Sequence, residues 1–180
     1  MQLTGGQYKN TKLTTPSGAR PTLSVVREGI FNILFSYFDE FEDKKFLDGF
    51  SGSGIMALEA HSRGFKVLAI EKNGKIFKET RENFKKLKIE NSILLYDFEK
   101  FIKSTKETFN IIYLDPPWDM NYEKFIELSL KKLENNGLLI IESDNKSKID
   151  FSAFENKNIE IIKDKNYGRC RITILRAIFS

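Results

Sequence analysis

Short, nearly continuous apolar runs alternate along the chain with stretches in which apolar residues recur every three or four positions. The apolar runs cover residues 44–50, 66–71, 92–97, 110–115 and 137–143. Such runs are typical of strands buried on both faces, as in a parallel sheet. The intervening stretches, residues 53–64, 73–88, 98–106 and 121–135, have the spacing of amphipathic helices. The alternation predicts βαβ units, in which each helix connects two parallel strands.

The two ends of the chain depart from this alternation. Residues 158–164 and 169–179 are strand-like runs joined by a turn around Asn166, Tyr167 and Gly168, which predicts an antiparallel hairpin. Residues 24–38 have helical spacing, and Thr22 or Ser24 is placed to cap the start of that helix. We therefore predict an α/β fold over residues 23–180, a mostly parallel seven-stranded sheet ending in an antiparallel hairpin. Residues 1–22, rich in Gly, Thr, Pro and basic side chains, should form a small N-terminal arm or hairpin.

Composition narrows the class of protein. Of the 180 residues 41% are hydrophobic, enough for the core of one domain, and the formal charge of +4 permits an anionic partner such as nucleic acid. The single cysteine, Cys170, excludes a disulfide within the chain, and the single histidine, His61, argues against zinc, so no metal is expected. There is no apolar signal core or membrane-length run, which favours a cytoplasmic protein without membrane contact. A monomer is the simplest expectation.

Four successive predicted strands end on an acidic residue: Asp48, Glu71, Asp97 and Asp115. Any one of them has an alternative role as a turn or helix-capping residue. In an open parallel sheet, however, the carboxyl ends of the strands form the crevice in which ligands bind. The four carboxylates together therefore predict one binding site.

The segment LDGFSGSGIMALEA follows the first of these strands and indicates the kind of ligand. Gly52 and Gly54 stand where the strand turns into a helix, so the backbone can approach a ligand closely. Asp48 would repel a pyrophosphate at this turn, but it suits a ligand with a cationic amine. This favours S-adenosylmethionine over a dinucleotide, and the sequence has no phosphate-binding loop of the G-x-x-x-x-G-K-[ST] type.

The next two strand ends suit the rest of such a cofactor. Glu71 is placed to accept hydrogen bonds from both ribose hydroxyls, as acidic residues do at this position in nucleotide-binding folds. Asp97 is placed to accept a hydrogen bond from the adenine amino group, with the ring of Phe98 packed alongside.

LDPPW, residues 114–118, and DGFSGSG are similar to motifs of class I S-adenosylmethionine-dependent methyltransferases that act on exocyclic amino groups of nucleobases. Together with GGQYKNTKL, RPTLSVVREGIFNIL, LDGFSGSGIMALEAHSRG and YGRCRITI, they resemble the RsmD family of bacterial methyltransferases acting on guanine N2 in 16S ribosomal RNA. The resemblance covers essentially the whole chain. Three positions depart from the family pattern: Gly49 replaces a common Leu, Ser51 a common Ala, and Trp118 the usual Phe or Tyr.

The resemblance implies a Rossmann-like fold, methyl transfer from S-adenosylmethionine, and 16S rRNA or an assembling small ribosomal subunit as partner. It assigns base and amine binding to Asp115, Pro116, Pro117 and Trp118. Lys9, Lys12 and Arg20 in the arm, with Arg27 on the following helix, form a basic set that could bind the phosphate backbone of a substrate or be ordinary solvated surface. The resemblance favours substrate binding by the arm and implies that Arg27 lies near the site. The residues expected to bind the cofactor are Asp48, Phe50, Ser51, Gly52, Ser53, Gly54, Glu71, Lys72, Asp97 and Phe98.

The chemistry of amine methylation fits the residues of LDPPW. The enzyme must chiefly align the amine with the activated methyl group and exclude water. Asp115 and the carbonyl of Pro116 can each accept one N–H of the amine, and the two prolines stiffen the loop without adding competing donors. Trp118 can stack on the base, as aromatic side chains do in single-strand binders.

Two other classes of function stay open on the sequence. The same loop would suit methylation of adenine N6 or cytosine N4 in DNA, or of another RNA, although the chain is short for a separate DNA-recognition domain. A binding protein or a dinucleotide oxidoreductase on the same fold is the other alternative. Outside the motifs, His61 and Cys170 are expected to be structural, and Tyr122 is expected to contact the start of a helix.

Overall fold

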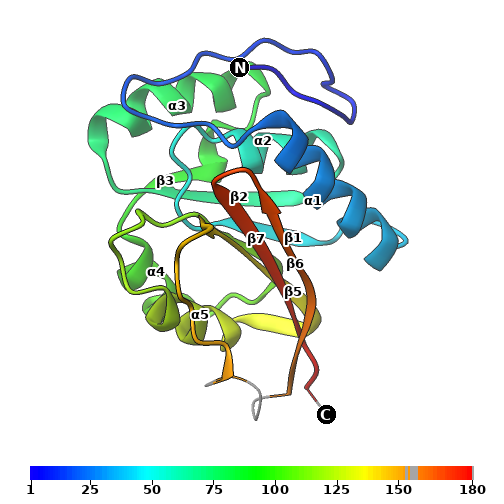
Figure 1. The fold of residues 1–180 in the computed structure, drawn as a ribbon. Helices are drawn as coiled ribbons and strands as arrows, with labels where there is room; N and C mark the ends of the chain where they lie inside the picture. Colours follow the sequence, from blue (N-terminus) through cyan, green and yellow to red (C-terminus); the bar gives the residue numbers. More distant parts are fainter. Residues whose placement is uncertain (153, 155–157, 180) are drawn as a thin grey trace. The chain divides into compact units, whose positions relative to one another are not determined.

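The computed structural model describes residues 1–152, 154 and 158–179, which divide into two compact units, Met1–Phe98 and Glu99–Ser180 (Figure 1). The division falls within the residues predicted as one methyltransferase domain, and the predicted boundary after residue 22 lies inside the first unit. The two units together contain the seven predicted strands among their described residues. In the part of the chain that the structure describes, no helix is both long and apolar enough to cross a bilayer.

The first unit is built on three parallel strands. Its elements are α1 (Ser24–Tyr37), β1 (Lys45–Asp48), α2 (Ile55–Ser62), β2 (Lys66–Glu71), α3 (Gly74–Lys86), a short 3-10 turn, η1 (Glu90–Ser92), and β3 (Ile93–Leu95). The strand order is β3-β2-β1, and Leu47 pairs with Leu68 in the register of β1 and β2. Phe46 and Leu47 of β1 are fully buried, as a strand covered on both faces requires. The acidic residues at the ends of β1 and β2 therefore emerge at one edge of this sheet.

Helix α1 starts differently from the prediction. Its N-cap is Leu23, which makes no side-chain capping bond, so the predicted cap at Thr22 or Ser24 is wrong. Ser24 is already the first helical residue and Thr22 lies one position before the cap, where its carbonyl accepts from the guanidinium of Arg27. Val26, Ile30 and Leu34 form the apolar stripe that the spacing predicted.

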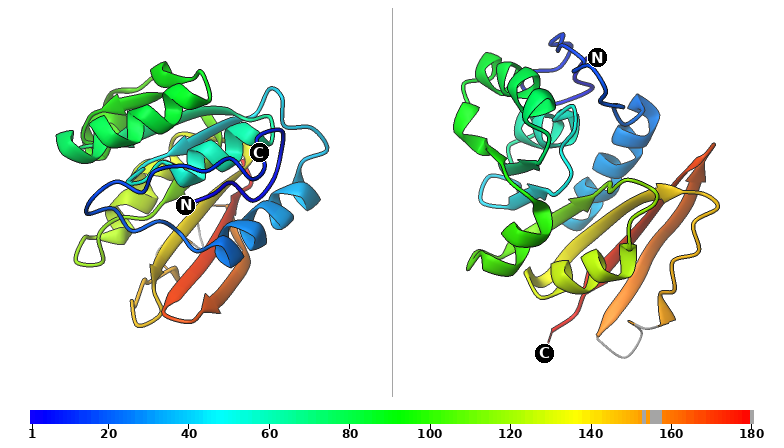
Figure 2. Two further views of the ribbon diagram at one scale, coloured as in Figure 1. Left: turned by 90° about the horizontal axis from the view of Figure 1, so that it is seen from above. Right: turned by 90° about the vertical axis from the view of Figure 1, so that its left-hand side faces the viewer.

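Residues 1–22 form an arm that lies across α2 and α3 (Figure 1, and Figure 2, left, dark blue). It turns back on itself through backbone bonds between Leu3 and Thr11 and one antiparallel bridge between Gln2 and Lys12. The two sides of the arm pair through that isolated bridge and form no continuous β-ladder. The arm is therefore a loop and not a two-stranded β-hairpin. Its apolar contribution is small, with Leu3 and Leu13 buried.

The second unit carries the predicted antiparallel ending. Its elements are α4 (Phe98–Ser104), which begins at the boundary, then β4 (Phe109–Leu114), α5 (Tyr122–Leu130), β5 (Leu133–Asp144), β6 (Ile159–Tyr167) and β7 (Cys170–Ala177). Strand β5 pairs in parallel with β4 and antiparallel with β7, and β7 pairs antiparallel with β6. The long β6–β7 hairpin, predicted from sequence, is confirmed (Figure 2, right).

Strand β5 begins earlier than the sequence predicted. The helix expected to reach residue 135 ends at Leu130, and β5 starts at Leu133 with a register shift against β4 between Phe109 and Ile111. Asn136 has a φ of +60°, which breaks a helix, and a side chain on Gly137 would lie 2.8 Å from the carbonyl of Glu134. The first residues of β5 are therefore irregular, and their helix-like spacing in the sequence led to the wrong prediction.

Candidate functional site

The loop between β1 and α2 is shaped by Asp48 and two glycines. Asp48 is buried at the end of β1, and its Oδ2 accepts a bond of 3.3 Å from the backbone N–H of Ala57 in the first turn of α2. Gly54 is the N-cap of α2 with a φ of +74°, and Gly52 has a φ of +49°. Both φ values lie in the left-handed region that glycine alone adopts at little cost. The motif thus bends tightly over a carboxylate, as predicted.

Gly54 also packs against α3 too closely to carry a side chain. A Cβ there would lie 2.6 Å from the ring of Phe84 and 2.7 Å from Cγ2 of Thr80. We expect Gly54→Ala to lower the free energy of unfolding by about 2 to 4 kcal/mol, through the left-handed φ and the overlap. Gly74→Ala is the control, because a Cβ at the start of α3 meets nothing within 4 Å and should stabilise by about 0.5 kcal/mol. Urea denaturation of both variants measures the difference, and equal stabilities would contradict this packing.

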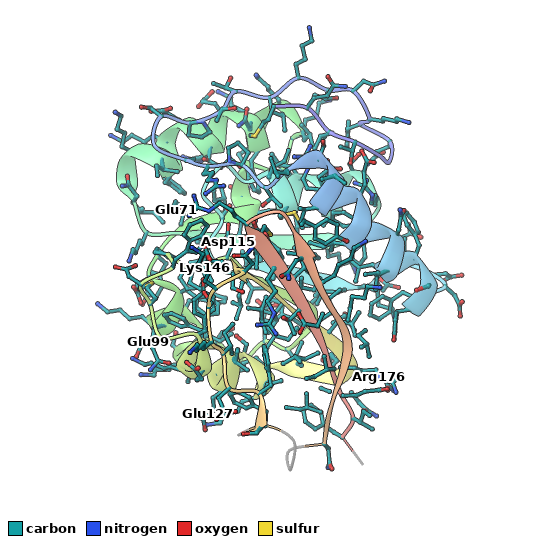
Figure 3. The ribbon with its side chains drawn as sticks, in the orientation of Figure 1. Glu71, Glu99, Asp115, Glu127, Lys146 and Arg176 are labelled. Atoms are coloured by element: carbon teal, nitrogen blue, oxygen red, sulfur yellow. The ribbon has the colours of Figure 1, made fainter. Side chains whose placement is uncertain are left out.

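Glu71, at the end of β2, is fixed by the loops on both sides of it (labelled in Figure 3). Its Oε2 accepts a 2.9 Å bond from the N–H of Gly52, and its Oε1 accepts a 2.6 Å bond from the N–H of Asn73. Each carboxylate oxygen can accept a second bond. Glu71 is therefore oriented in advance for a diol, beside the loop that contains Gly52.

Six further residues predicted to bind the cofactor lie in this loop or directly after β2 and β3. The hydroxyl of Ser51 is buried and forms no hydrogen bond to any residue that the structure describes. Phe50 and Phe98 lie together with ring centroids 4.9 Å apart, and Asp97 is half-buried directly before Phe98. Ser53 is buried, whereas Lys72 is exposed.

These observations test whether the first unit fits S-adenosylmethionine. The buried hydroxyl of Ser51 bonds to no described residue and, together with the two glycines of the loop, suits the amino-acid end of the cofactor. The carboxylate of Glu71, which is already oriented by its two backbone bonds, suits the ribose. The paired rings of Phe50 and Phe98 offer an apolar surface for a purine. The residues present therefore fit the cofactor, within one unit of the chain.

The second unit presents the LDPPW loop at the end of β4. Asp115 is half-buried, Pro116 is buried, and the side chain of Trp118 is 41% exposed. Because so much of the indole ring is exposed, it can stack on a ligand and contributes little to the hydrophobic core. The strand β4 ends at Leu114, directly before the loop.

Tyr122 supports this loop in a way that the sequence did not show. It is the first residue of α5, it is buried, and its hydroxyl donates to the carbonyl of Pro116 at 3.4 Å. Burial raises the pKa of Tyr122 far above its ordinary value, and the charge of Asp115 raises it further. The hydroxyl therefore stays protonated, as a donor must. The expected helix contact is present, and Tyr122 also bonds to the loop.

Arg169, in the turn of the β6–β7 hairpin, makes a second contact to the LDPPW loop that the sequence did not reveal. Its guanidinium lies 5.4 Å from the ring centroid of Trp118, within the range of a cation–π contact. It also lies 3.5 Å from a carboxylate oxygen of Asp144 at the end of β5. A hairpin turn far along the chain thus reaches the exposed ring of the LDPPW loop, which no local pattern indicates.

The predicted substrate-binding residues fall into two groups. Lys9, Lys12 and Arg20 have exposed side chains on the arm. Arg27 is buried on α1, where its Nε lies 3.0 Å from Oε1 of the fully buried Glu59 on α2. The charge of Arg27 is thus paired inside the first unit. Arg27 nevertheless shares with Lys9 the lining of a pocket of about 550 Å³ between the arm and α1, and its guanidinium donates to the Gln2 carbonyl of the arm at 2.9 Å.

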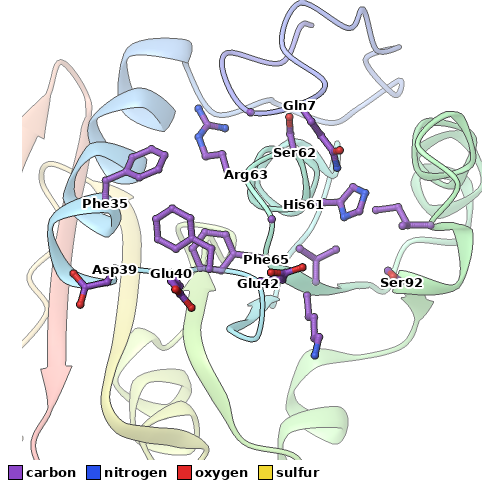
Figure 4. A pocket seen from close by; sticks show the side chains of 16 residues that line it. Gln7, Phe35, Asp39, Glu40, Glu42, His61, Ser62, Arg63, Phe65 and Ser92 are labelled. Atoms are coloured by element: carbon purple, nitrogen blue, oxygen red, sulfur yellow. The ribbon is translucent and has the colours of Figure 1, made fainter.

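His61 and a nearby pocket lie at the other end of α2. His61 stacks on Tyr8 of the arm with ring centroids 5.6 Å apart, and burial lowers the pKa of its imidazole. The pocket has a volume of about 1100 Å³, and Figure 4 shows Phe35, Glu42 and His61 among its lining side chains. None of the predicted site residues lines it. Among the described residues no group of three or more His, Cys, Asp or Glu side chains is arranged to hold a metal ion.

Comparison with known proteins agrees with the fold and the motifs. A family described as "Conserved hypothetical protein 95" matches residues 1–176. "Ribosomal RNA small subunit methyltransferase D" of Escherichia coli K12 is 32% identical over 79% of this chain and 71% of its own length. A solved structure of a hypothetical protein from Thermus thermophilus has a TM-score of 0.82 at 22% identity and covers 99% of both chains. The tRNA m1G37 methyltransferase of M. jannaschii has a TM-score of 0.66 at 21% identity over 89% of this chain and 51% of its own.

The fold and the motif residues define a class I S-adenosylmethionine-dependent methyltransferase. This confirms the predicted fold class, a mostly parallel seven-stranded sheet that ends in an antiparallel hairpin. Within that class, the chain belongs to the family of conserved hypothetical protein 95, the RsmD family, as its motifs predicted.

Proposed function

We propose that this methyltransferase transfers a methyl group from S-adenosylmethionine to the exocyclic N2 amino group of a guanine in 16S rRNA. The observation that carries the proposal is the loop Asp115–Trp118, which combines a half-buried carboxylate, a buried proline carbonyl and an exposed indole at a strand end. Membership of the family adds weight, because an E. coli relative is named for the small-subunit ribosomal RNA. The proposed setting is the cytoplasm, with a monomer acting on the RNA or on an assembling small subunit.

The cofactor supplies an already activated methyl group, so the chain's own residues chiefly bind, orient and exclude water. In the first unit, Asp48 would meet the cationic amine of the cofactor, and Glu71 would accept from its ribose hydroxyls. Gly52 and Gly54 let the backbone come close, and Phe50 and Phe98 would pack on the adenine. Asp97 would accept from the adenine amino group.

In the second unit, Asp115 would accept one N–H of the target amine, and the carbonyl of Pro116 would accept the other. The amine nitrogen gains positive charge as it attacks, and a carboxylate stabilises that charge. Tyr122 already donates to the Pro116 carbonyl at 3.4 Å, which leaves one lone pair of that oxygen for the amine. The tyrosine bond therefore fixes the direction in which the carbonyl presents itself.

Trp118 provides the stacking surface in this proposal. We expect Trp118→Ala to raise the KM for the RNA substrate roughly 5- to 150-fold, because stacking of one base on an aromatic ring contributes about 1 to 3 kcal/mol. The ring is exposed, so its loss opens no core cavity. Trp118→Phe is the matched variant and should keep a KM near that of the original chain. An unchanged KM in the alanine variant would remove the indole from substrate binding.

Two assays test the proposed function. Calorimetric titration with S-adenosylmethionine and with NADH separates the classes, and we expect binding of the first compound alone. Tritiated methyl transfer to under-methylated small ribosomal subunits, naked 16S rRNA and plasmid DNA then separates the substrates, and we expect label only in the two RNA samples. Label confined to DNA would refute the RNA proposal, and binding of NADH alone would refute the cofactor.

A further inference from the structure

The arm of residues 1–22 is held on the rest of the first unit mainly by polar contacts to two helices. On α2, the fully buried Glu59 accepts from the backbone N–H of Thr4 at 2.8 Å and from its hydroxyl at 2.9 Å. The same carboxylate pairs with Arg27 at 3.0 Å and with Arg63. Burying a charge is costly unless it is fully paired and hydrogen-bonded, so these four contacts explain how Glu59 remains inside.

The second anchor is Asn83 on α3. Its Oδ1 accepts from the N–H of Thr14 at 2.9 Å, and its Nδ2 donates to the carbonyl of Thr14 at 2.8 Å. The amide thus pairs with both backbone groups of one arm residue, as a neighbouring strand would. Asn83 is fully buried, so its polar group serves this contact and not solvent.

The end of α2 adds a tight fit that fixes the other side of the arm. The hydroxyl of Ser62 donates to the carbonyl of Gly5 at 2.6 Å and accepts from the N–H of Tyr8 at 3.0 Å. A Cβ on Gly6, whose φ is +76°, would lie 1.8 Å from the carbonyl oxygen of Ser62. Figure 4 shows Gln7 and Ser62 close together here, and the N–H of Gln7 donates to the Ser62 carbonyl at 2.7 Å.

These contacts specify a position more than they add stability. A buried hydrogen bond contributes only about 0.5 to 1.5 kcal/mol net, whereas its directional geometry defines where each partner lies. The arm buries few apolar side chains and exposes Lys9 and Lys12, two cations in a protein proposed to bind RNA. Phosphate contacts of this kind depend on where the charges stand along the backbone.

We propose that Asn83 is a positioning residue for RNA binding, which holds the arm as a preformed platform for the RNA backbone and touches neither RNA nor cofactor. The inference rests on the proposed function, because it requires an RNA substrate. Docking in advance lowers the conformational entropy that the arm loses on binding. Loss of the anchor should therefore weaken RNA binding and leave the chemistry unchanged.

The same helix supplies a matched control one turn away. Thr80, also fully buried on α3, donates through its hydroxyl to the carbonyl of Gly52 in the β1–α2 loop at 2.7 Å. Asn83 thus contacts the arm, whereas Thr80 contacts the loop proposed to bind the cofactor. We expect Asn83→Ala to raise the KM for under-methylated small subunits about 10-fold, the loss of two hydrogen bonds, with unchanged kcat and cofactor Kd. We expect Thr80→Val to raise the cofactor Kd and leave the RNA KM unchanged.

Two further variants make the test independent of how well Asn83→Ala folds. Gly6→Ala should displace the arm from the end of α2 and raise the RNA KM in the same way. When Lys9 and Lys12 are both replaced by Ala, adding Asn83→Ala should raise the KM by less than about twofold, because the anchor then has no charges to position. A full additional effect in that background would show that Asn83 acts elsewhere.

The outcomes separate this inference from the proposed function. If the unaltered chain methylates no RNA, the proposed function fails before any variant is compared. If the unaltered chain is active and Asn83→Ala keeps its RNA KM, this inference alone is overturned. A parallel rise of RNA KM and cofactor Kd, with a lower melting temperature, would also overturn it by showing a purely structural role.

Discussion

Asp115→Ala is expected to lower kcat for methyl transfer roughly 100- to 1000-fold, the usual cost of removing one preorganised group that stabilises developing charge. The carboxylate is half-buried at the end of β4, where it would accept an N–H of the amine and oppose the charge that forms on nitrogen. Asp115 is not among the residues predicted to bind the cofactor, so the Kd for S-adenosylmethionine should stay unchanged. Single-turnover kinetics with saturating cofactor measures the effect, and calorimetry measures the Kd.

Asp119→Ala is the matched control for this prediction. Asp119 is the same residue type four positions further along the loop and is exposed, so its removal should leave kcat near that of the unaltered chain. Normal turnover in Asp115→Ala would show that the carboxylate does not orient the amine. Loss of turnover in both variants would show that the loop needs charge in general and not a positioned acceptor.

Glu71→Gln is expected to raise the Kd for S-adenosylmethionine about 10- to 100-fold, since hydrogen bonds to a charged group contribute about 1.5 to 3 kcal/mol each. Both carboxylate oxygens accept backbone N–H groups, from Gly52 and from Asn73. In a glutamine side chain the NH₂ group would face one of these N–H donors, and two donors cannot form a hydrogen bond with each other. The loop around Gly52 would loosen as well as the contact to ribose. Calorimetric titration measures the Kd.

Glu82→Gln provides the comparison, because Glu82 is an exposed glutamate on α3 of the same unit and its replacement removes the same charge. Its cofactor Kd should match that of the unaltered chain. A Glu71 variant that binds the cofactor normally would exclude the ribose contact. A Kd raised equally in both variants would assign the effect to net charge.

The fold was largely predictable because burial on both faces makes central strands nearly continuous apolar runs. The prediction was wrong for residues 131–135, where helical spacing continues but the positive φ of Asn136 and the close contacts of Gly137 belong to an irregular strand entry. It was also wrong for the cap of α1, because the helix begins at Ser24 after Leu23, which makes no side-chain capping bond.

The candidate site was predictable to the extent that its residues stand at strand ends. Asp48 and Glu71 could be found this way, since the carboxyl ends of parallel strands share an edge. Arg169 could not, because its position over Trp118 depends on the pairing of two distant strands. Arg27 was expected to bind substrate among exposed cations, but the sequence could not show that Glu59 pairs with it in the interior.

Asn83 illustrates the same limit in a helix. Its position on α3 matches the buried face of an amphipathic helix, and nothing local identifies Thr14 as its partner. A contact between residues 69 positions apart becomes visible only when the fold places the arm across α3.

Methylation of the guanine N2 amino group in 16S rRNA by this chain can be observed on the modified nucleoside itself. Its most direct test is to digest small-subunit rRNA, labelled by the chain with tritiated S-adenosylmethionine, to nucleosides and to identify the labelled one by chromatography and mass spectrometry. We expect the label in N2-methylguanosine. Label in N6-methyladenosine or N4-methylcytidine, with none in N2-methylguanosine, would contradict it.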